Sequence, residues 1–465
     1  MSMRRAVAIH RVARVARVGV ALVVLMLAAC AGRMDRPDLE RLYAAARGAQ
    51  PPVVLVHGVL GSKLRRGNVE LWPGGLTRLA FSDYRDLALQ IDPATLQPID
   101  DGSAPFALFD RAAGTDFYGA IVRTLEDAGG YRACTPGQPP TADRCLYVFL
   151  YDWRQDNVVS AGALDTLIEQ IRHDHHDPDL RVDVVAHSNG GLVTRYYARY
   201  GTVDLLDGNS FAVTHAGAAK LRRVVLLGTP NFGSLESLKG LIEGVRIGFR
   251  RLPPEVLLSM PSAYQLLPHA LNTWIISARG EPLQRDLFDA TLWRRFQWGV
   301  YAPEVRARIA ASAGDAEAGA MRLADFERYV EKQLERARRF TWALSVEEPP
   351  GGVHPVVLGG DCHLTPARLL VEEVDGESVL RLWPDEIAAP VAGVDYDTLM
   401  LEPGDGTVTK ASLLAREALD PHVPRHPWSS FGYDYVVFLC ERHDQLTGNA
   451  EFQDNLLHAL LSVDR

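Results

Sequence analysis

The chain alternates short apolar runs with longer amphipathic stretches over most of its length. Helical patterns at residues 118–128, 161–171 and 192–200 separate several of the runs. Short valine- and leucine-rich runs are typical of strands buried on both faces, and helices between strands favour parallel pairing. The pattern predicts an α/β fold with a mostly parallel central sheet and helices on both faces. The predicted strands are residues 52–57, 146–151, 182–185, 223–227, 356–358 and 435–439.

Two segments interrupt this alternation, and we interpret them as insertions into the core. Residues 61–114 show little periodicity, and we expect them to form a lid-like insertion. The stretch at 238–344 reads as helical throughout, so we expect a helical cap over 238–345. Insertions of this kind cover the functional site of a core domain. The core would then comprise residues 51–237 and 346–465.

Two elements in the later half have a clear pattern of their own. An amphipathic helix is predicted at 321–339, and an antiparallel hairpin at 368–374 and 378–383 around an Asp-Gly turn. One face of the helix carries apolar residues at helical spacing, which is typical of core packing. These residues are Leu323, Phe326, Val330 and Leu334.

The first 30 residues have the pattern of an export signal. Five arginines precede an apolar run at 18–29, which is too short to span a bilayer comfortably, and no acidic residue occurs before Asp35. The sequence Leu-Ala-Ala-Cys at 27–30 resembles the lipobox of bacterial lipoproteins. We expect a signal peptide at 1–29, lipidation of Cys30, and a tether at 30–50. The alternative is an ordinary secretory signal with an incidental cysteine.

The envelope location follows from the same segment by analogy with bacterial lipoproteins. Ala31, where aspartate would favour retention at the inner membrane, indicates the outer membrane, with the chain facing the periplasm or the cell surface. The lipidated Cys30 would be the membrane contact. The sequence specifies no oligomeric state.

The charge balance narrows the range of partners. The formal net charge is −9, and removal of the five arginines of the signal would take it to −14. An acidic chain without a basic cluster after Arg17 is a poor candidate for nucleic-acid binding.

Four cysteines remain besides Cys30, an even number that suits an oxidising compartment. Cys134 and Cys145 bracket a proline-rich loop and are expected to close it. Cys362 and Cys440 would then tie two late segments together. Four cysteines permit three pairings, and the other two stay open. No cysteine spacing resembles a zinc site, and no metal or cofactor is expected.

The segment 181–193 carries the clearest chemical signal. A buried strand ends at Ala186-His187-Ser188-Asn189-Gly190, and an amphipathic helix begins at once. A sharp strand-to-helix turn exposes a serine hydroxyl at the edge of the sheet, and the residues two before and two after the serine must be small. Ser188 is therefore the candidate nucleophile.

A serine nucleophile needs a base, a carboxylate that orients the base, and donors for the oxyanion. Asp405 lies in a glycine-flanked turn, and His443 follows the last predicted strand. The order Ser188, Asp405, His443 is that of α/β-hydrolases. The oxyanion donors are expected to be two backbone N–H groups, those of Val59 after the first strand and Asn189 after the serine.

Other histidines are weaker candidates. His173, His175 and His176 cluster with two aspartates, which is more typical of a solvated turn than of a metal site. His57 and His187 lie beside the motifs and are expected to shape the pocket. His363 is the rival base, but it precedes Asp405 and so contradicts the expected order.

Several segments together resemble the lecithin:cholesterol acyltransferase family, which includes phospholipid:diacylglycerol acyltransferases and a lysosomal phospholipase. The resemblance covers most of residues 51–461 and thins inside the two insertions. It is carried by Val54-Leu-Val-His-Gly-Val-Leu-Gly-Ser-Lys-Leu64, Phe117-Tyr118 through Gly130-Tyr131, Tyr151-Asp-Trp-Arg154, Ala186-His-Ser-Asn-Gly-Gly-Leu192, Leu227-Gly-Thr-Pro-Asn-Phe-Gly-Ser234, Gly404-Asp-Gly-Thr-Val408 and His443.

The resemblance implies an α/β-hydrolase core with a lid and a cap. It also implies cleavage of a glycerolipid ester, with the acyl group held on Ser188 and passed to an alcohol or to water. Asp152 and Arg154 match a family motif and are expected to form an ion pair of the scaffold. The chain departs from the family in two places. No cysteine clamps the lid, and Val59 stands where some relatives have cysteine or aspartate.

The sequence therefore predicts a serine-dependent acyltransferase or phospholipase-type esterase that acts on a lipid or lipid-like ester. The first alternative is a plain carboxylesterase or lipase without acyl transfer. The second is a surface lipoprotein that keeps the fold as a binding module.

Overall fold

The computed structural model describes residues 37–46, 48–112, 114–270, 274–375, 377–415 and 432–462. The predicted signal peptide and Cys30 lie outside these residues. The chain divides into residues 1–42 and residues 43–465. In the first part the described residues include the beginning of the short helix α2 (Leu39–Tyr43).

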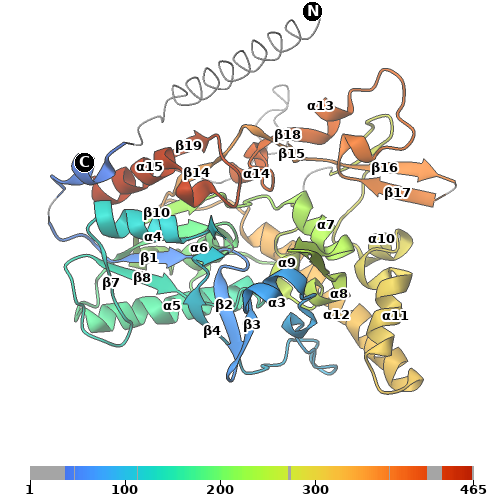
Figure 1. The fold of residues 1–465 in the computed structure, drawn as a ribbon, viewed down its shortest axis with the longest axis horizontal. Coiled ribbons are helices and arrows are strands. Elements are labelled where there is room, and N and C mark those ends of the chain that lie inside the picture. Colours follow the sequence, from blue (N-terminus) through green and yellow to red (C-terminus); the bar gives the residue numbers. More distant parts are fainter. Residues whose placement is uncertain are drawn as a thin grey trace, which may run out of the picture. The chain divides into compact units, whose positions relative to one another are not determined.

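A seven-stranded sheet forms the centre of the fold, in the order β19-β14-β10-β9-β1-β8-β7 (Figure 1). All of its neighbouring strands pair in parallel. The predicted mostly parallel sheet and its six predicted strands are confirmed. The strands are β1 (Val53–Val56), β7 (Arg132–Ala133), β8 (Cys145–Phe149), β9 (Val182–His187), β10 (Leu221–Leu227), β14 (Val356–Gly360) and β19 (Tyr435–Leu439).

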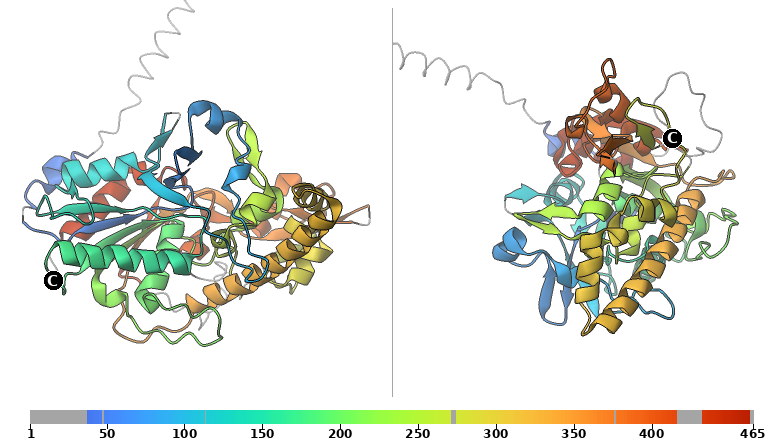
Figure 2. Two further views of the ribbon diagram at one scale, coloured as in Figure 1. Left: turned by 90° about the horizontal axis from the view of Figure 1, so that it is seen from below. Right: turned by 90° about the vertical axis from the view of Figure 1, so that its right-hand side faces the viewer.

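Helices cover both faces of this sheet, as predicted. On one face lie α4 (Gly119–Arg123), which continues as one π-helical turn (Thr124–Ala128), and α15 (Ala450–Leu461) (Figures 1 and 2). The other face carries α5 (Asn157–Asp174), which packs against α6 (Asn189–Tyr200). Strand β1 can be purely apolar because neither of its faces meets water, and all four of its residues are buried.

The first insertion is more regular than its sequence indicates. It contains an antiparallel sheet of β2 (Ser62–Arg66), β3 (Val69–Trp72) and β4 (Ser103–Leu108), with α3 (Leu76–Phe81) and a 3₁₀ turn (Arg85–Leu87). A small ladder of β5 (Arg111–Ala112) and β6 (Thr115–Asp116) follows. Register shifts in the pairing of β2 with both neighbours break the alternation of side chains, which explains the weak periodicity.

The second insertion corrects a prediction, because residues 238–344 are only partly helical. Helices of this region are α7 (Leu235–Glu243), α8 (Pro254–Leu257), α9 (Pro261–Tyr264), α10 (Ala290–Arg295), α11 (Pro303–Ala311) and α12 (Ala316–Ala343). Between them lie a hairpin of β11 (Val245–Ile247) and β12 (Arg250–Leu252), the strand β13 (Ile275–Ser277) and a 3₁₀ turn (Gly299–Tyr301). The predicted amphipathic helix lies within α12, with Val330 and Leu334 fully buried in the core of this region.

The late hairpin is confirmed as β16 (Leu369–Val374) paired with β17 (Glu377–Arg381). Strand β13 extends it in parallel through β16, so the second insertion and the late core share a three-stranded sheet. A separate ladder joins β15 (His363–Pro366) to β18 (Leu401–Gly404). The short helices α13 (Tyr396–Met400) and α14 (Lys410–Leu413) flank β18.

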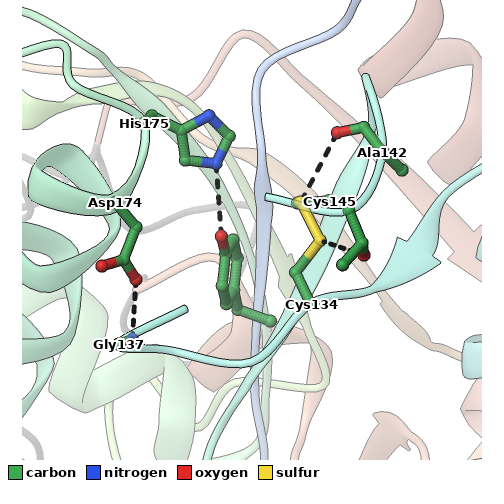
Figure 3. The surroundings of a disulfide bond; sticks show 8 residues. Cys134, Gly137, Ala142, Cys145, Asp174 and His175 are labelled. Atoms are coloured by element: carbon green, nitrogen blue, oxygen red, sulfur yellow. Dashed lines mark hydrogen bonds between the residues drawn. A yellow bond between two sulfur atoms is a disulfide. The ribbon is translucent and has the colours of Figure 1, made fainter. Parts of the chain in front are cut away.

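Two disulfides are present, Cys134–Cys145 and Cys362–Cys440, the pairs that the loop argument favoured. The first closes the proline-rich loop between β7 and β8, and the Gly137 N–H of that loop donates to Asp174 at the end of α5 (Figure 3). The second joins the ends of β14 and β19. Among the described residues, no helix combines the length and apolar character needed to cross a membrane.

Candidate active site

Ser188 occupies the turn between β9 and α6. Its backbone angles are φ 54° and ψ −125°, a region that costs a residue with a side chain on the order of 1–3 kcal/mol. The strain is held by the fold on both sides, because the Ser188 N–H donates to the carbonyl of Leu227 at 2.9 Å and α6 begins at the next residue. The hydroxyl thus stands at the carboxyl edge of the sheet.

The need for glycine at position 190 arises from the neighbouring strand. A Cβ on Gly190 would lie 2.5 Å from the His57 carbonyl oxygen and 2.7 Å from that of Val56. Both distances are shorter than any ordinary contact. The turn therefore packs directly against the end of β1.

The structure brings the three predicted residues together. His443 Nε2 lies 3.0 Å from Ser188 Oγ, and His443 Nδ1 lies 2.8 Å from Asp405 Oδ2. The His443 N–H also donates to the Asp405 carbonyl at 3.0 Å. Asp405 follows β18 and His443 follows β19, so the group depends on three distant segments.

The charges of this group support one another. Burial alone would raise the pKa of Asp405, but the charge of His443 and hydrogen bonds from His443, Val408 and Thr407 outweigh it and lower that pKa. Burial alone would lower the pKa of His443, yet the charge and hydrogen bond of Asp405 raise it. Asp405 is therefore an anion that stabilises a positive charge on His443.

Backbone without side chains lies against all three residues. A Cβ on Gly58 would be 2.7 Å from Ser188 Cβ, and one on Gly360 would be 2.6 Å from Asp405 Cβ. Gly228, at φ 56°, would place a Cβ 3.2 Å from the ring of His443. We call these three positions the glycine wall.

The predicted oxyanion donors belong to the two segments that meet at Ser188, since Gly58 packs against the Cβ of Ser188. Val59 follows Gly58, and Asn189 is the first residue of α6. Neither backbone N–H donates to another group among the described residues. Unpaired backbone N–H groups are what an oxyanion site requires, so Val59 and Asn189 stay the candidates for it.

None of the other described histidines takes the place of His443, although the backbone of His363 forms a bridge with Asp405. His363 pairs with Gly404 at the start of β15, and the structure joins His443, not His363, to Ser188. Burial lowers the pKa of His57 to about 4. Burial, followed by the charge of His443, lowers that of His187 to about 3.

The predicted polar turn at the end of α5 also has defined neighbours. The side chain of His173 is 81% exposed, and His175 Nε2 lies 3.2 Å from the hydroxyl of Tyr147 (Figure 3). Among the described residues, no group of three or more metal-ligating side chains is placed to hold an ion.

The expected scaffold ion pair is present. Arg154 is fully buried and contacts both carboxylate oxygens of Asp152, with Nη2–Oδ2 at 2.7 Å and Nε–Oδ1 at 2.9 Å. Asp101 of the first insertion lies 3.6 Å from Nη1. The pair therefore joins the core to the insertion.

Sequence reasoning missed two tyrosines at this site. The hydroxyl of Tyr151 donates to the His57 carbonyl, and the Gly58 N–H donates to the hydroxyl of Tyr118, each at 2.8 Å. Both tyrosines lie in segments that carry the family resemblance, which is the signal that marks them.

Part of the chain matches a known protein family. Residues 140–302 match the lecithin:cholesterol acyltransferase family model. The matched range includes Ser188 and the Tyr151–Arg154 segment, and it confirms the predicted resemblance. No curated protein sequence is similar enough to this chain to register as a match.

Solved structures give the fold. A chain of the Tle4–Tli4 complex is 15% identical, covering 89% of this chain and 98% of its own length at a TM-score of 0.54. The mature Bacillus licheniformis lipase BlEst2 is 11% identical, covering 90% and 94%, at 0.32. Phospholipase PlaB from Legionella pneumophila is 15% identical, covering 46% and 32%, at 0.23. The chain has the α/β-hydrolase fold. The family match supports a lipid-ester hydrolase or acyltransferase in general terms.

Proposed function

We propose that this chain is a serine enzyme that takes an acyl group from a glycerolipid ester and passes it to an alcohol or to water. The observation that carries the proposal is the position of His443, whose two ring nitrogens face Ser188 Oγ at 3.0 Å and Asp405 Oδ2 at 2.8 Å. A nucleophile, a base and an orienting carboxylate in this relation perform acyl transfer on unrelated folds.

The mechanism follows from the geometry. Ser188 Oγ attacks the ester carbonyl while its proton passes to His443 Nε2, and the N–H groups of Val59 and Asn189 stabilise the oxyanion. Collapse of the tetrahedral intermediate breaks the ester bond, and the leaving alcohol takes the proton from His443. Water or an acceptor alcohol then gives its proton to His443 and attacks the acyl-Ser188 ester. Collapse of this second tetrahedral intermediate breaks the bond between the acyl group and Ser188, and Ser188 Oγ takes the proton back from His443.

The compartment is part of the proposal. Export through residues 1–29 and lipidation of Cys30 would place the enzyme on the bacterial outer membrane. The two disulfides support this location, because such bonds persist in oxidising compartments and are rare in the cytosol.

Labelled phospholipid tests the function and separates it from its alternatives. We expect the purified enzyme to release a labelled fatty acid and, with a long-chain alcohol present, to form the labelled alcohol ester. Release without ester formation would favour a plain lipase. A chain that neither cleaves the lipid nor reacts with a fluorophosphonate would be a binding module, contrary to the proposal.

An exposed apolar surface supports a lipid substrate rather than a soluble one. Leu76 and Phe81 of α3 and Phe249 of the β11–β12 hairpin are 72%, 60% and 72% exposed. The two phenylalanine rings stack at 5.6 Å, and the Phe249 N–H donates to the Ala80 carbonyl at 2.9 Å. Arg246 and Arg250 flank the tip of the hairpin. Apolar side chains beside exposed arginines suit contact with an anionic lipid surface.

Replacing both phenylalanines should separate lipid activity from chemistry. Phe81→Ser with Phe249→Ser is expected to lower the rate on phospholipid vesicles about tenfold or more, since burial of one phenylalanine contributes about 1.5–3 kcal/mol. The rate on a soluble short-chain ester should stay unchanged. Val159→Ser with Val203→Ser, which alters two exposed side chains elsewhere, is the matched control. Equal losses on both substrates would contradict the role of this surface.

A further inference from the structure

A single peptide group, the one between His57 and Gly58, is held at both ends by tyrosine hydroxyls. Its carbonyl oxygen accepts from Tyr151 Oη at 2.8 Å, and its N–H donates to Tyr118 Oη at 2.8 Å. The carbonyl and the N–H of a trans peptide point in opposite directions, so the two tyrosines approach it from opposite sides. This is the last peptide before the Gly58–Val59 peptide that carries the proposed oxyanion donor.

Tyr118 connects this peptide to the residue before the nucleophile. Its hydroxyl accepts from Gly58, so its own proton goes to His187 Nδ1, which lies 2.8 Å away. His187 is neutral, because burial lowers its pKa to about 3, and Nδ1 is therefore free to accept. Tyr118 itself is fixed as the residue that precedes α4.

Tyr151 connects the same peptide to the residue after the nucleophile. The side-chain amide of Asn189 donates to its hydroxyl at 3.4 Å, and that amide is itself fixed by two hydrogen bonds with Asn157, at 2.9 and 3.0 Å. The ring of Tyr151 also stacks on His57, with centroids 4.4 Å apart and planes at 9°.

The contact of Gly58 with Ser188 makes the position of this peptide critical. No Cβ fits at Gly58, so the loop runs as close to Ser188 as backbone atoms allow. Any rotation of the His57–Gly58 peptide would turn the Val59 N–H relative to Ser188 and Asn189.

We propose that Tyr118 and Tyr151 are positioning residues that set the place of the Val59 N–H relative to the Asn189 N–H. The inference rests on the proposed function and adds to it the pair of side chains that pre-forms the oxyanion site. Both hydroxyls have all their hydrogen-bonding partners within the protein, so they hold the loop and take no proton from the substrate.

The variants Tyr118→Phe and Tyr151→Phe test this assignment, each on its own. Removing one oxyanion donor costs an enzyme about 10²–10³-fold in turnover, so displacing one should lower kcat about 10- to 100-fold. KM for a soluble short-chain ester should change less than about twofold, because the donors act on the transition state. The rate of reaction with a fluorophosphonate, whose adduct carries the same tetrahedral oxygen, should fall in parallel.

The matched control is Tyr131→Phe. Tyr131 is also fully buried, but its hydroxyl has no hydrogen-bond partner among the described residues. It should keep its kcat. The pH at which kcat/KM is half-maximal should be the same in all three variants, because none of the three hydroxyls forms a hydrogen bond with Asp405 or His443.

We call Tyr118 and Tyr151 the tyrosine clamp. The outcomes of these experiments separate the role of this clamp from the proposed function. Unchanged kcat in both clamp variants, a loss confined to KM, an equal loss in Tyr131→Phe, or a shifted pH profile would each overturn the clamp while leaving the nucleophile in place. A Ser188→Ala variant that is as active as the wild-type enzyme would instead overturn the proposed function. The two tyrosines are independent tests, so one variant that fails to fold leaves the other to decide.

Discussion

Ser188→Ala is expected to lower kcat for phospholipid cleavage about 10⁶-fold, to the detection limit of most assays. The magnitude is that of a serine that works as a unit with its base and orienting carboxylate. The hydrogen bond from Ser188 to His443 and the strained backbone at φ 54° have no other evident structural use. Hydrolysis of labelled phospholipid and labelling by a fluorophosphonate should both disappear.

The control for this change is Ser210→Ala, which removes an exposed serine hydroxyl from the loop after α6. It should keep both activities. Phospholipid cleavage above the background of the purification in Ser188→Ala would show that another group attacks the ester. Labelling of the Ser188→Ala variant by the fluorophosphonate would likewise show that another group is the nucleophile.

His443→Ala should reduce kcat by a comparable factor, about 10⁵–10⁶, because the serine then has no group to take its proton. His363→Ala should leave kcat within a factor of about two. The two histidines have similar sequence surroundings, each just past a strand and a disulfide cysteine. Only His443 has one ring nitrogen within hydrogen-bond distance of Ser188 Oγ and the other within hydrogen-bond distance of Asp405. A large loss in His363→Ala would reverse the assignment.

The pH profile tests the same base without a mutation. His443 works when it is neutral, so kcat/KM should rise with pH and level off above its pKa. Asp405 raises that pKa above its ordinary value of 6.5. The rise should therefore be centred on the alkaline side of 6.5, and a midpoint below it would contradict the stabilising role of Asp405.

Much of the core could be predicted because burial on both faces leaves a strong signal. Strand β1 is entirely apolar, and β9, which is buried along most of its length, leads directly into the turn at Ser188. The carboxyl ends of parallel strands meet at one edge of the sheet. The order of Ser188, Asp405 and His443 was therefore enough to expect them together.

The structure of the two insertions was harder to predict from the sequence, for physical reasons. Strand β13 has three residues and pairs with β16, whose first residue lies more than ninety positions later, so no local pattern reveals it. The bulged strand β2 loses its alternation. The tyrosine clamp was missed for a related reason, since Tyr118 and Tyr151 reach His57 and Gly58 through hydroxyl groups, which hydrophobic periodicity does not register.

The glycine wall has a consequence for how such an enzyme can change over time. An added methyl group would lie 2.7 Å from Ser188 Cβ at Gly58 and 2.6 Å from Asp405 Cβ at Gly360, and Gly228 holds a positive φ beside the ring of His443. Substitutions at Gly58 or Gly360 would displace Ser188 or Asp405 directly. We therefore expect new substrate preferences to arise in the two insertions, whose surfaces can vary while the reacting atoms keep their places.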